Sequence, residues 1–195
     1  RSSSAASDVY KRQVLLLSSA LGMLITASAN DFLTIFVGIE LSAFSSYGLV
    51  AFRKTDDKST EAGAKYLLIG AFSSALTLYG ISLLYALTGS VTFEGVNAFL
   101  TGIDNGVIDG DFSELIFISS LFIIAGLGFK IAVVPFHAWA PDVYEGAPTP
   151  VTALLAAASK AMGFVALFKV FIFTLEPFSD EWSLCLLYTS PSPRD

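Results

Sequence analysis

Residues 128–148 read GFKIAVVPFHAWAPDVYEGAP, and three features occur together in them. Lys130 is the only Lys, Arg, Asp or Glu in the run 115–141. Pro135 follows it, and proline cannot donate the backbone hydrogen bond that a continuous helix needs. His137, the only histidine of the chain, comes directly after this break. An apolar helix with a buried cation and a break is a poor structural element, but these features fit an ion path.

The composition indicates a membrane protein, because hydrophobic residues make up 54% of the chain and charged residues only 14%. A soluble domain usually carries about a quarter charged residues. A helix crosses a bilayer with about 20 apolar residues. We therefore predict an all-α integral membrane protein with about five transmembrane helices, one of them broken at Pro135. They are expected at residues 14–29, 32–52, 60–87, 114–139 and 150–175.

The two ends of the chain differ abruptly from the apolar part. Residues 1–13 (RSSSAASDVYKRQ) and 179–195 (SDEWSLCLLYTSPSPRD) are polar, and both resemble translated adapter or vector sequence. Short disordered tails are the other interpretation. We predict that both segments are non-native or disordered and that the transmembrane bundle comprises residues 14–178.

The net charge of −6 does not indicate a nucleic-acid partner, because the acids gather in connections between helices. The connection 88–113 and its edge contain acidic residues and no Lys or Arg, whereas Arg53, Lys54 and Lys58 lie between the second and third predicted helices. Cytoplasmic loops carry an excess of Lys and Arg. We therefore expect the 53–58 connection and the segment 137–150 on the cytoplasmic side.

The single cysteine, Cys185, excludes an internal disulfide and any cysteine-based metal or iron–sulfur site in this chain. No glycine-rich phosphate loop, HExxH or Cys-x-x-Cys motif occurs. The sequence therefore predicts neither a bound cofactor nor a metal site nor a redox centre.

Three ionisable residues are expected at mid-depth on three different helices, namely Glu40, Lys130 and Lys160. Each such group costs roughly 2.5–3.5 kcal/mol on insertion scales, so it is a candidate functional residue. The alternative is a structural ion pair that locks helix packing. Tyr47, two turns after Glu40 on the same helix face, is the expected partner of Glu40 within its helix.

Lys65 and His137 are further candidates. Lys65 follows Glu61 by one turn, which favours a local ion pair, and a lysine near a helix end can reach water. His137 could simply bond to a carbonyl freed by Pro135, but histidine titrates near neutral pH without help. Lys169, near the end of its helix, is expected to extend toward water.

These residues together suggest a proton relay. Burial disfavours a charged lysine, whereas a nearby carboxylate favours it. A carboxylate that moves toward or away from the lysine therefore switches it between holding and releasing a proton. We hypothesise that Glu40 modulates Lys130, that Lys130 passes protons toward Lys160, and that Lys65 and His137 tune or feed the route.

The stretch 128–151, GFKIAVVPFHAWAPDVYEGAPTPV, followed by Ala-Ser-Lys160, resembles the antiporter-like membrane subunits of respiratory complex I, the proton-translocating NADH–quinone oxidoreductase. The segments 142–148 (DVYEGAP) and 61–72 (EAGAKYLLIGAF) look most like its subunit N, called subunit 2 in organelles. The resemblance covers about residues 14–178.

This resemblance implies a fold of about fourteen helices with two inverted five-helix repeats, each containing a broken helix. The present chain is similar to the first repeat only. Glu40 matches the family's ion-pair glutamate, Lys130 its broken-helix lysine and Lys160 its central connecting lysine. Lys65 matches a further lysine of subunit N.

The resemblance also implies where the other components lie. NADH, FMN, iron–sulfur clusters and quinone would bind to partner subunits, and the other membrane-arm subunits would be neighbours. The chain is expected to cross a bacterial plasma membrane or an organellar inner membrane several times and to carry protons.

Two rivals remain open. One is a subunit of a multi-subunit sodium/proton antiporter of the same superfamily, which shares the Pro-Phe-His-x-Trp-x-Pro motif found at residues 135–141. The other is a structural membrane module whose buried charges only hold helices together.

Overall fold

The computed structural model describes residues 2–108, 110, 112–180 and 182–183, and within them the chain is a bundle of helices. The α-helices are α1 (Ser2–Ser28), α2 (Phe32–Val50), α3 (Asp57–Thr88), α4 (Phe93–Asp104), α5 (Ser113–Ile131), α6 (Trp139–Gly146), α7 (Thr149–Leu154) and α8 (Lys160–Leu167). Shorter helical segments are η1 (Leu155–Ser159), η2 (Phe168–Thr174) and η3 (Glu176–Phe178).

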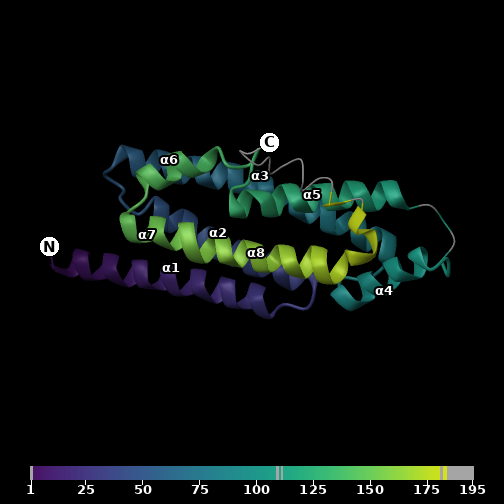
Figure 1. Cartoon of the computed structure of the whole chain (residues 1–195). Coiled ribbons are helices and arrows are strands. Elements are labelled where there is room, and N and C mark those ends of the chain that lie inside the picture. The colour runs from purple at the N-terminus through teal and green to yellow at the C-terminus, as the bar shows by residue number, and fades with distance from the viewer. Residues whose placement is uncertain (1, 109, 111, 181, 184–195) are drawn as a thin grey trace.

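The long helices run along one axis of the molecule, with α6 and α7 toward one end and α4 at the other (Figure 1). Helix α1 packs along α2, α3 packs along α5, and α8 contacts both α1 and α5. Helix α6 lies against the first part of α3 at one end of the bundle, and α4 lies at the opposite end. The two ends of the bundle are therefore built from different short helices.

Four helical stretches are long and apolar enough to cross a membrane, which confirms the prediction of an all-α membrane protein. They are Phe32–Val50, Asp57–Thr88, Ser113–Ile131 and Thr149–Thr174. Helix α1, which contains the fifth predicted span at 14–29, is not among them. Its first half carries polar and charged residues such as Lys11 and Arg12, so its apolar part is shorter than the roughly 20 residues that a span needs.

The described parts of both predicted tails are folded: the first is helical, and the second packs against the bundle. Helix α1 begins at Ser2 rather than near residue 14. Trp182 is buried against Phe171, and its indole nitrogen donates a hydrogen bond of 2.8 Å to the carbonyl of Leu175. The bundle therefore extends past residue 178. That the terminal segments are non-native stays a prediction, and residues 184–195 lie outside the described part of the chain.

The break after Lys130 begins earlier than Pro135, so the helix predicted at 114–139 is shorter than expected. Helix α5 ends at Ile131, and Ala132 takes a left-handed conformation with φ 57°. The amide of Val133 then donates to the carbonyl of Gly128 over 3.1 Å, a common way of ending a helix. Because the residue before a proline is kept out of the helical conformation, the chain turns before Pro135 is reached.

The helix predicted at 150–175 is interrupted by wider turns. The π-helical segments Leu155–Ser159 and Phe168–Thr174 lie on either side of α8. Such segments are uncommon and are found frequently at functional sites. Lys160 is the first residue after the first of them.

Helices α3 and α5 approach closely through glycines. A Cβ atom at Gly126 would lie 2.9 Å from the carbonyl oxygen of Ser73, and one at Gly80 would lie 2.8 Å from that of Ser119. Small residues allow membrane helices to pack closely. This packing fixes the end of α5 that carries Lys130 against the middle of α3.

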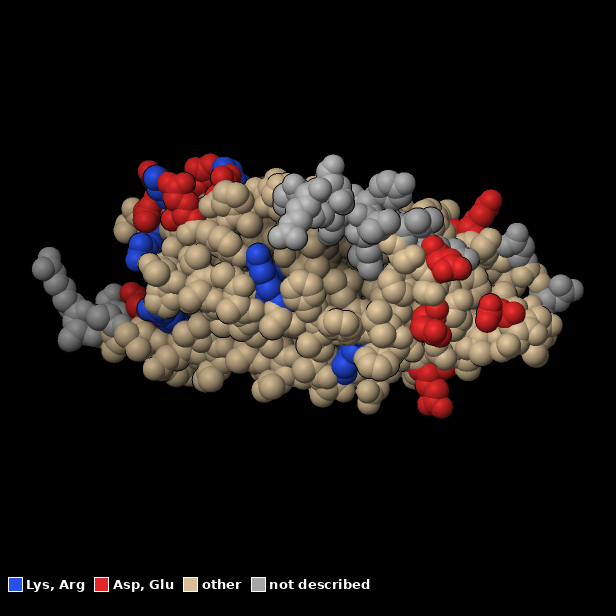
Figure 2. Space-filling view, viewed as in Figure 1, with Lys and Arg blue, Asp and Glu red and all other residues tan. Residues whose placement is uncertain are grey.

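Charges divide between the two ends of the bundle (Figure 2). Lys, Arg, Asp and Glu gather together at the end where α6 lies, whereas the visible charges near α4 are acidic. The basic residue Lys58, at the start of α3, thus lies at the same end as α6, with which it forms an ion pair, as the charge pattern of the sequence predicts.

Candidate functional site

Lys130 lies in the last turn of α5, directly before the helix break. Its side chain is 5% exposed, and its ammonium nitrogen is buried without a hydrogen-bond partner among the described residues. The nitrogen lies 5.5 Å from the centroid of the Phe129 ring. Burying a charged ammonium without a partner is costly. Lys130 must therefore be neutral here, or a carboxylate or water must stabilise its charge.

Glu40 is half-buried in the middle of α2, and its carboxylate accepts a hydrogen bond from the hydroxyl of Ser74 on α3. It is close enough to interact electrostatically with Lys130. Among the described residues, however, Glu40 forms no ion pair within 4.0 Å. The predicted partner Tyr47 is wrong, because the Tyr47 hydroxyl has no hydrogen-bond partner in the described part of the chain.

Lys160 is half-buried at the start of α8, where its ammonium nitrogen lies 5.9 Å from the centroid of the Tyr144 ring. Gly163, one turn later, packs against α5. A Cβ atom at Gly163 would lie 3.4 Å from Cβ of Lys130. Helices α5 and α8 therefore meet at Lys130, one turn beyond Lys160.

Aromatic rings fill the space beside the end of α5. The ring of Tyr66 lies 4.7 Å from that of Tyr47 and 4.8 Å from that of Trp139, measured between centroids. The Trp139 indole donates a hydrogen bond of 3.1 Å to the carbonyl of Phe129, which also accepts one of 3.2 Å from the amide of Ala132. The cluster thus attaches the first turn of α6 to the end of α5 and packs beside the break between them. The sequence analysis missed it, since no local spacing relates these residues.

Lys65 is not part of the group around Lys130. It is exposed, and it forms ion pairs with Glu61 at 2.8 Å and with Asp142 at 2.7 Å. The pair with Glu61 follows from the one-turn spacing. The pair with Asp142 joins α3 to α6, and the sequence analysis missed it.

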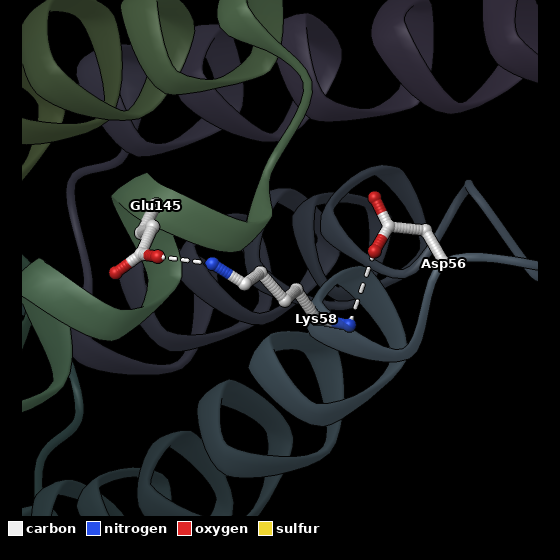
Figure 3. A network of polar contacts seen from close by, with 3 residues as sticks. All are labelled: Asp56, Lys58 and Glu145. Carbon is white, nitrogen blue, oxygen red and sulfur yellow. Dashed lines mark hydrogen bonds and ion pairs between the residues drawn. The ribbon is translucent and has the colours of Figure 1, made fainter.

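A second ion pair joins the same two helices. The ammonium of Lys58 lies 2.6 Å from Oε1 of Glu145, and the backbone amide of Lys58 donates to Asp56 (Figure 3). A pocket of about 150 Å³ lies between the helices and is lined by the residues of both pairs and their neighbours, Lys58, Glu61, Ala62, Lys65, Asp142, Glu145 and Gly146. Helix α6 is thus held on α3 by opposite charges.

His137 lies within the break, and its side chain is exposed. Its carbonyl oxygen accepts a hydrogen bond of 3.0 Å from the amide of Ala140 at the start of α6. The structure therefore places His137 between α5 and α6, where its neighbours Pro135, Phe136 and Ala138 face Ile69, Phe72 and Ser73 in the middle of α3.

Lys169 does not extend toward water as expected. Its ammonium donates a hydrogen bond of 2.7 Å to the carbonyl of Ala29, just beyond the end of α1. The reason is that this end of α1 packs close to α8 and leaves a carbonyl without a helical partner.

No group of three or more His, Cys, Asp or Glu side chains in the described residues could hold a metal ion. Cys185 lies outside the described residues. The prediction that the chain binds no cofactor stays a prediction.

The family model for "NADH:quinone oxidoreductase/Mrp antiporter, TM" matches residues 29–191. The chain belongs to this family. It is 51% identical over 158 residues to NADH-quinone oxidoreductase subunit N of Heliobacterium modesticaldum, a match that covers 81% of the chain and 31% of the relative. The family membership confirms the resemblance read from residues 128–151 and agrees with a transmembrane location.

Solved structures show the same fold. A chain of respiratory complex I from Thermus thermophilus is 35% identical with a TM-score of 0.70, and the match covers 83% of this chain and 34% of that one. A chain of the Mrp complex from Dietzia sp. DQ12-45-1b also gives a TM-score of 0.70, covering 83% of this chain and 29% of that one, but at 22% identity it shows the fold alone. The sequence thus spans about a third of the length of the relatives that it matches.

Proposed function

We propose that this chain is part of the membrane-arm subunit N of an NADH–quinone oxidoreductase and that the subunit translocates protons. The 51% identity to a subunit N relative supports this assignment. The greater identity to a complex I chain, 35% against 22% for the Mrp chain, favours it over a sodium/proton antiporter subunit.

The observation that carries the proposal is the buried ammonium of Lys130 at a helix break. Glu40 on α2 interacts with it electrostatically, and α8, which begins at Lys160, packs against Lys130 at Gly163. A charge in this position is retained at a cost, which a purely structural residue would avoid. In the proposed relay Glu40 biases the charge on Lys130, and Lys130 exchanges protons with Lys160 through water.

Lys65 and His137 have different proposed roles. Lys65 holds α6 on α3 through Asp142 and thereby tunes the route. His137, exposed in the break between α5 and α6, feeds protons into the route.

Electron transfer would take place in other subunits. By the resemblance to complex I, NADH, FMN, iron–sulfur clusters and quinone are assigned to those partners, and the one cysteine of this sequence, Cys185, could not hold an iron–sulfur cluster by itself. The contribution of this chain to the enzyme is then the coupled movement of protons through the membrane.

The test uses the full-length parent subunit in its native membrane complex. Lys130→Met removes the charge and keeps an apolar side chain of similar length. We expect NADH-driven quinone reduction and proton uptake into inverted vesicles to fall together by about tenfold or more, because an essential proton carrier is lost.

Lys169→Met is the matched control, since it removes another membrane lysine that lies outside the proposed route. It should retain coupled proton uptake. Normal uptake by assembled Lys130→Met would show that Lys130 only locks helix packing. Loss of sodium tolerance with intact NADH oxidation, in a strain that lacks the subunit, would favour the antiporter instead.

A further inference from the structure

Ser74 on α3, which the sequence analysis did not single out, is placed between two hydrogen-bond acceptors. Its hydroxyl donates to Oε1 of Glu40 and also lies 3.0 Å from the carbonyl oxygen of Gly70. A serine hydroxyl has one hydrogen to donate and two lone pairs that accept. Ser74 can therefore donate fully to only one of the two oxygens at a time.

This geometry suits a carboxyl group that gains and loses a proton. When Glu40 is ionised, its carboxylate is the stronger acceptor and takes the hydrogen of Ser74. When Glu40 is protonated, its own O–H can donate to the Ser74 oxygen, and Ser74 then turns its hydrogen to the carbonyl of Gly70. Glu40 is hydrogen-bonded in both states, and only a hydroxyl has to rotate.

Tyr47 supplies a second hydroxyl to the same place. It lies two turns after Glu40 on the same face of α2, and the side chain is 6% exposed. Its oxygen occupies the space that a side chain at Gly70 would fill. The hydroxyl is buried without a partner among the described residues, and buried polar groups of this kind are usually satisfied by a bound water.

We propose that Ser74 is a positioning residue for Glu40, exchanging its hydrogen bond between Glu40 and Gly70 as Glu40 changes its protonation state. The Tyr47 hydroxyl lies beside this exchange, against Gly70. The inference rests on the proposed function, because it takes Glu40 to be part of the proton route.

The experiment again uses the full-length subunit in its native complex in inverted vesicles. Ser74→Ala removes the hydroxyl, and it should lower NADH-driven proton uptake about tenfold, the cost of losing a hydrogen bond to a charged group. Ser74→Thr keeps the hydroxyl and should retain at least about half of the uptake. Tyr47→Phe should lower uptake about threefold.

A spectroscopic measurement separates positioning from packing. The infrared carboxyl band that Glu40→Gln removes should shift in Ser74→Ala and stay in place in Ser74→Thr. The matched controls are Ser45→Ala, which removes a buried hydroxyl bonded to the carbonyl of Leu41, and Tyr79→Phe, which removes an exposed phenol from α3. Both controls should leave the band and the uptake unchanged.

The outcomes distinguish this inference from the proposed function. If Lys130→Met stops uptake while Ser74→Ala changes neither uptake nor the band, the Ser74 inference alone is overturned. Equal loss in Ser74→Thr and Ser74→Ala also overturns it. If Lys130→Met pumps normally, the proposed function fails. If Ser74→Ala does not assemble, Ser74→Cys replaces it, because a thiol of similar size is only a weak donor, and the same losses are expected.

Discussion

At the scale of single residues, the end of α5 combines a buried cation with a strained backbone. Ala132 has φ 57° and ψ 47°, a left-handed conformation in which glycine is the usual residue. An alanine held there costs on the order of 1–3 kcal/mol. The hydrogen bond from Val133 to Gly128 and the packing of Trp139 hold the turn in place, so the chain leaves the helix directly after Lys130.

Replacing Ala132 by glycine should relieve this strain. We expect Ala132→Gly to stabilise the subunit by about 1 kcal/mol, since glycine adopts a positive φ without a steric penalty. The measurement is the thermal midpoint of the purified complex. Ala138→Gly is the control, because Ala138 has φ −59° and gains nothing from glycine. A lower midpoint for Ala132→Gly than for Ala138→Gly would contradict the proposed strain.

At the scale of elements, α6 links one end of the bundle to the group around Lys130. Two ion pairs attach it to α3, and Gly146 packs so closely that a Cβ atom there would lie 2.6 Å from the carbonyl of Lys58. Tyr144, between the two acids of these pairs, lies under the ammonium of Lys160. A displacement of α6 would therefore change the surroundings of the Lys160 ammonium, because Tyr144 moves with α6.

This arrangement assigns Lys65 a role that an exchange of charges can test. If Lys65 acts by holding α6, then Lys65→Asp alone should reduce coupled proton uptake, and Lys65→Asp with Asp142→Lys should restore most of it, because the attraction between α3 and α6 returns. Proton uptake by inverted vesicles is the measurement. High salt should lower proton uptake less in Lys65→Asp than in the wild type or the double variant, because Lys65→Asp has already lost the ion pair that salt screens. Failure of the double variant would instead indicate that Lys65 itself carries protons.

At the scale of the whole molecule, the bundle presents apolar side chains outward along its length. Leu68, Phe72 and Phe173 are each at least 66% exposed, as expected for helices that face lipid or further membrane helices. Charges are confined mainly to the two ends (Figure 2). The basic residues between α2 and α3 lie at the end where α6 lies, and the positive-inside rule predicts that this end faces the cytoplasm.

The orientation can be measured by labelling single cysteines with a membrane-impermeant maleimide. In a background without other cysteines, Val107→Cys, in the connection after α4 with 81% of the side chain exposed, should react in right-side-out vesicles. Lys54→Cys, between α2 and α3, should react in inverted vesicles. The opposite pattern would reverse the proposed direction of the route.

Local sequence was sufficient for the class of protein, for most helix positions, for the buried Lys130 and for the half-buried Glu40 and Lys160. These depend on hydrophobic run length and on isolated charges, which are properties of neighbouring residues. The pair between Glu61 and Lys65 also follows from sequence, because one helical turn brings such residues together. The motif around Pro135 indicated a break, although not that it would begin at Ala132.

Packing between distant helices decided the rest. Ser74 meets Glu40, Asp142 meets Lys65, and the Trp139 indole meets the Phe129 carbonyl across turns or helix interfaces that no local spacing encodes. The close approach of α3 and α5 through Gly126, and that of α5 and α8 through Gly163, set which polar groups become neighbours. The pairing of Lys65 with Asp142, away from Lys130, has the same cause, since position along a bundle depends on where each helix begins and ends.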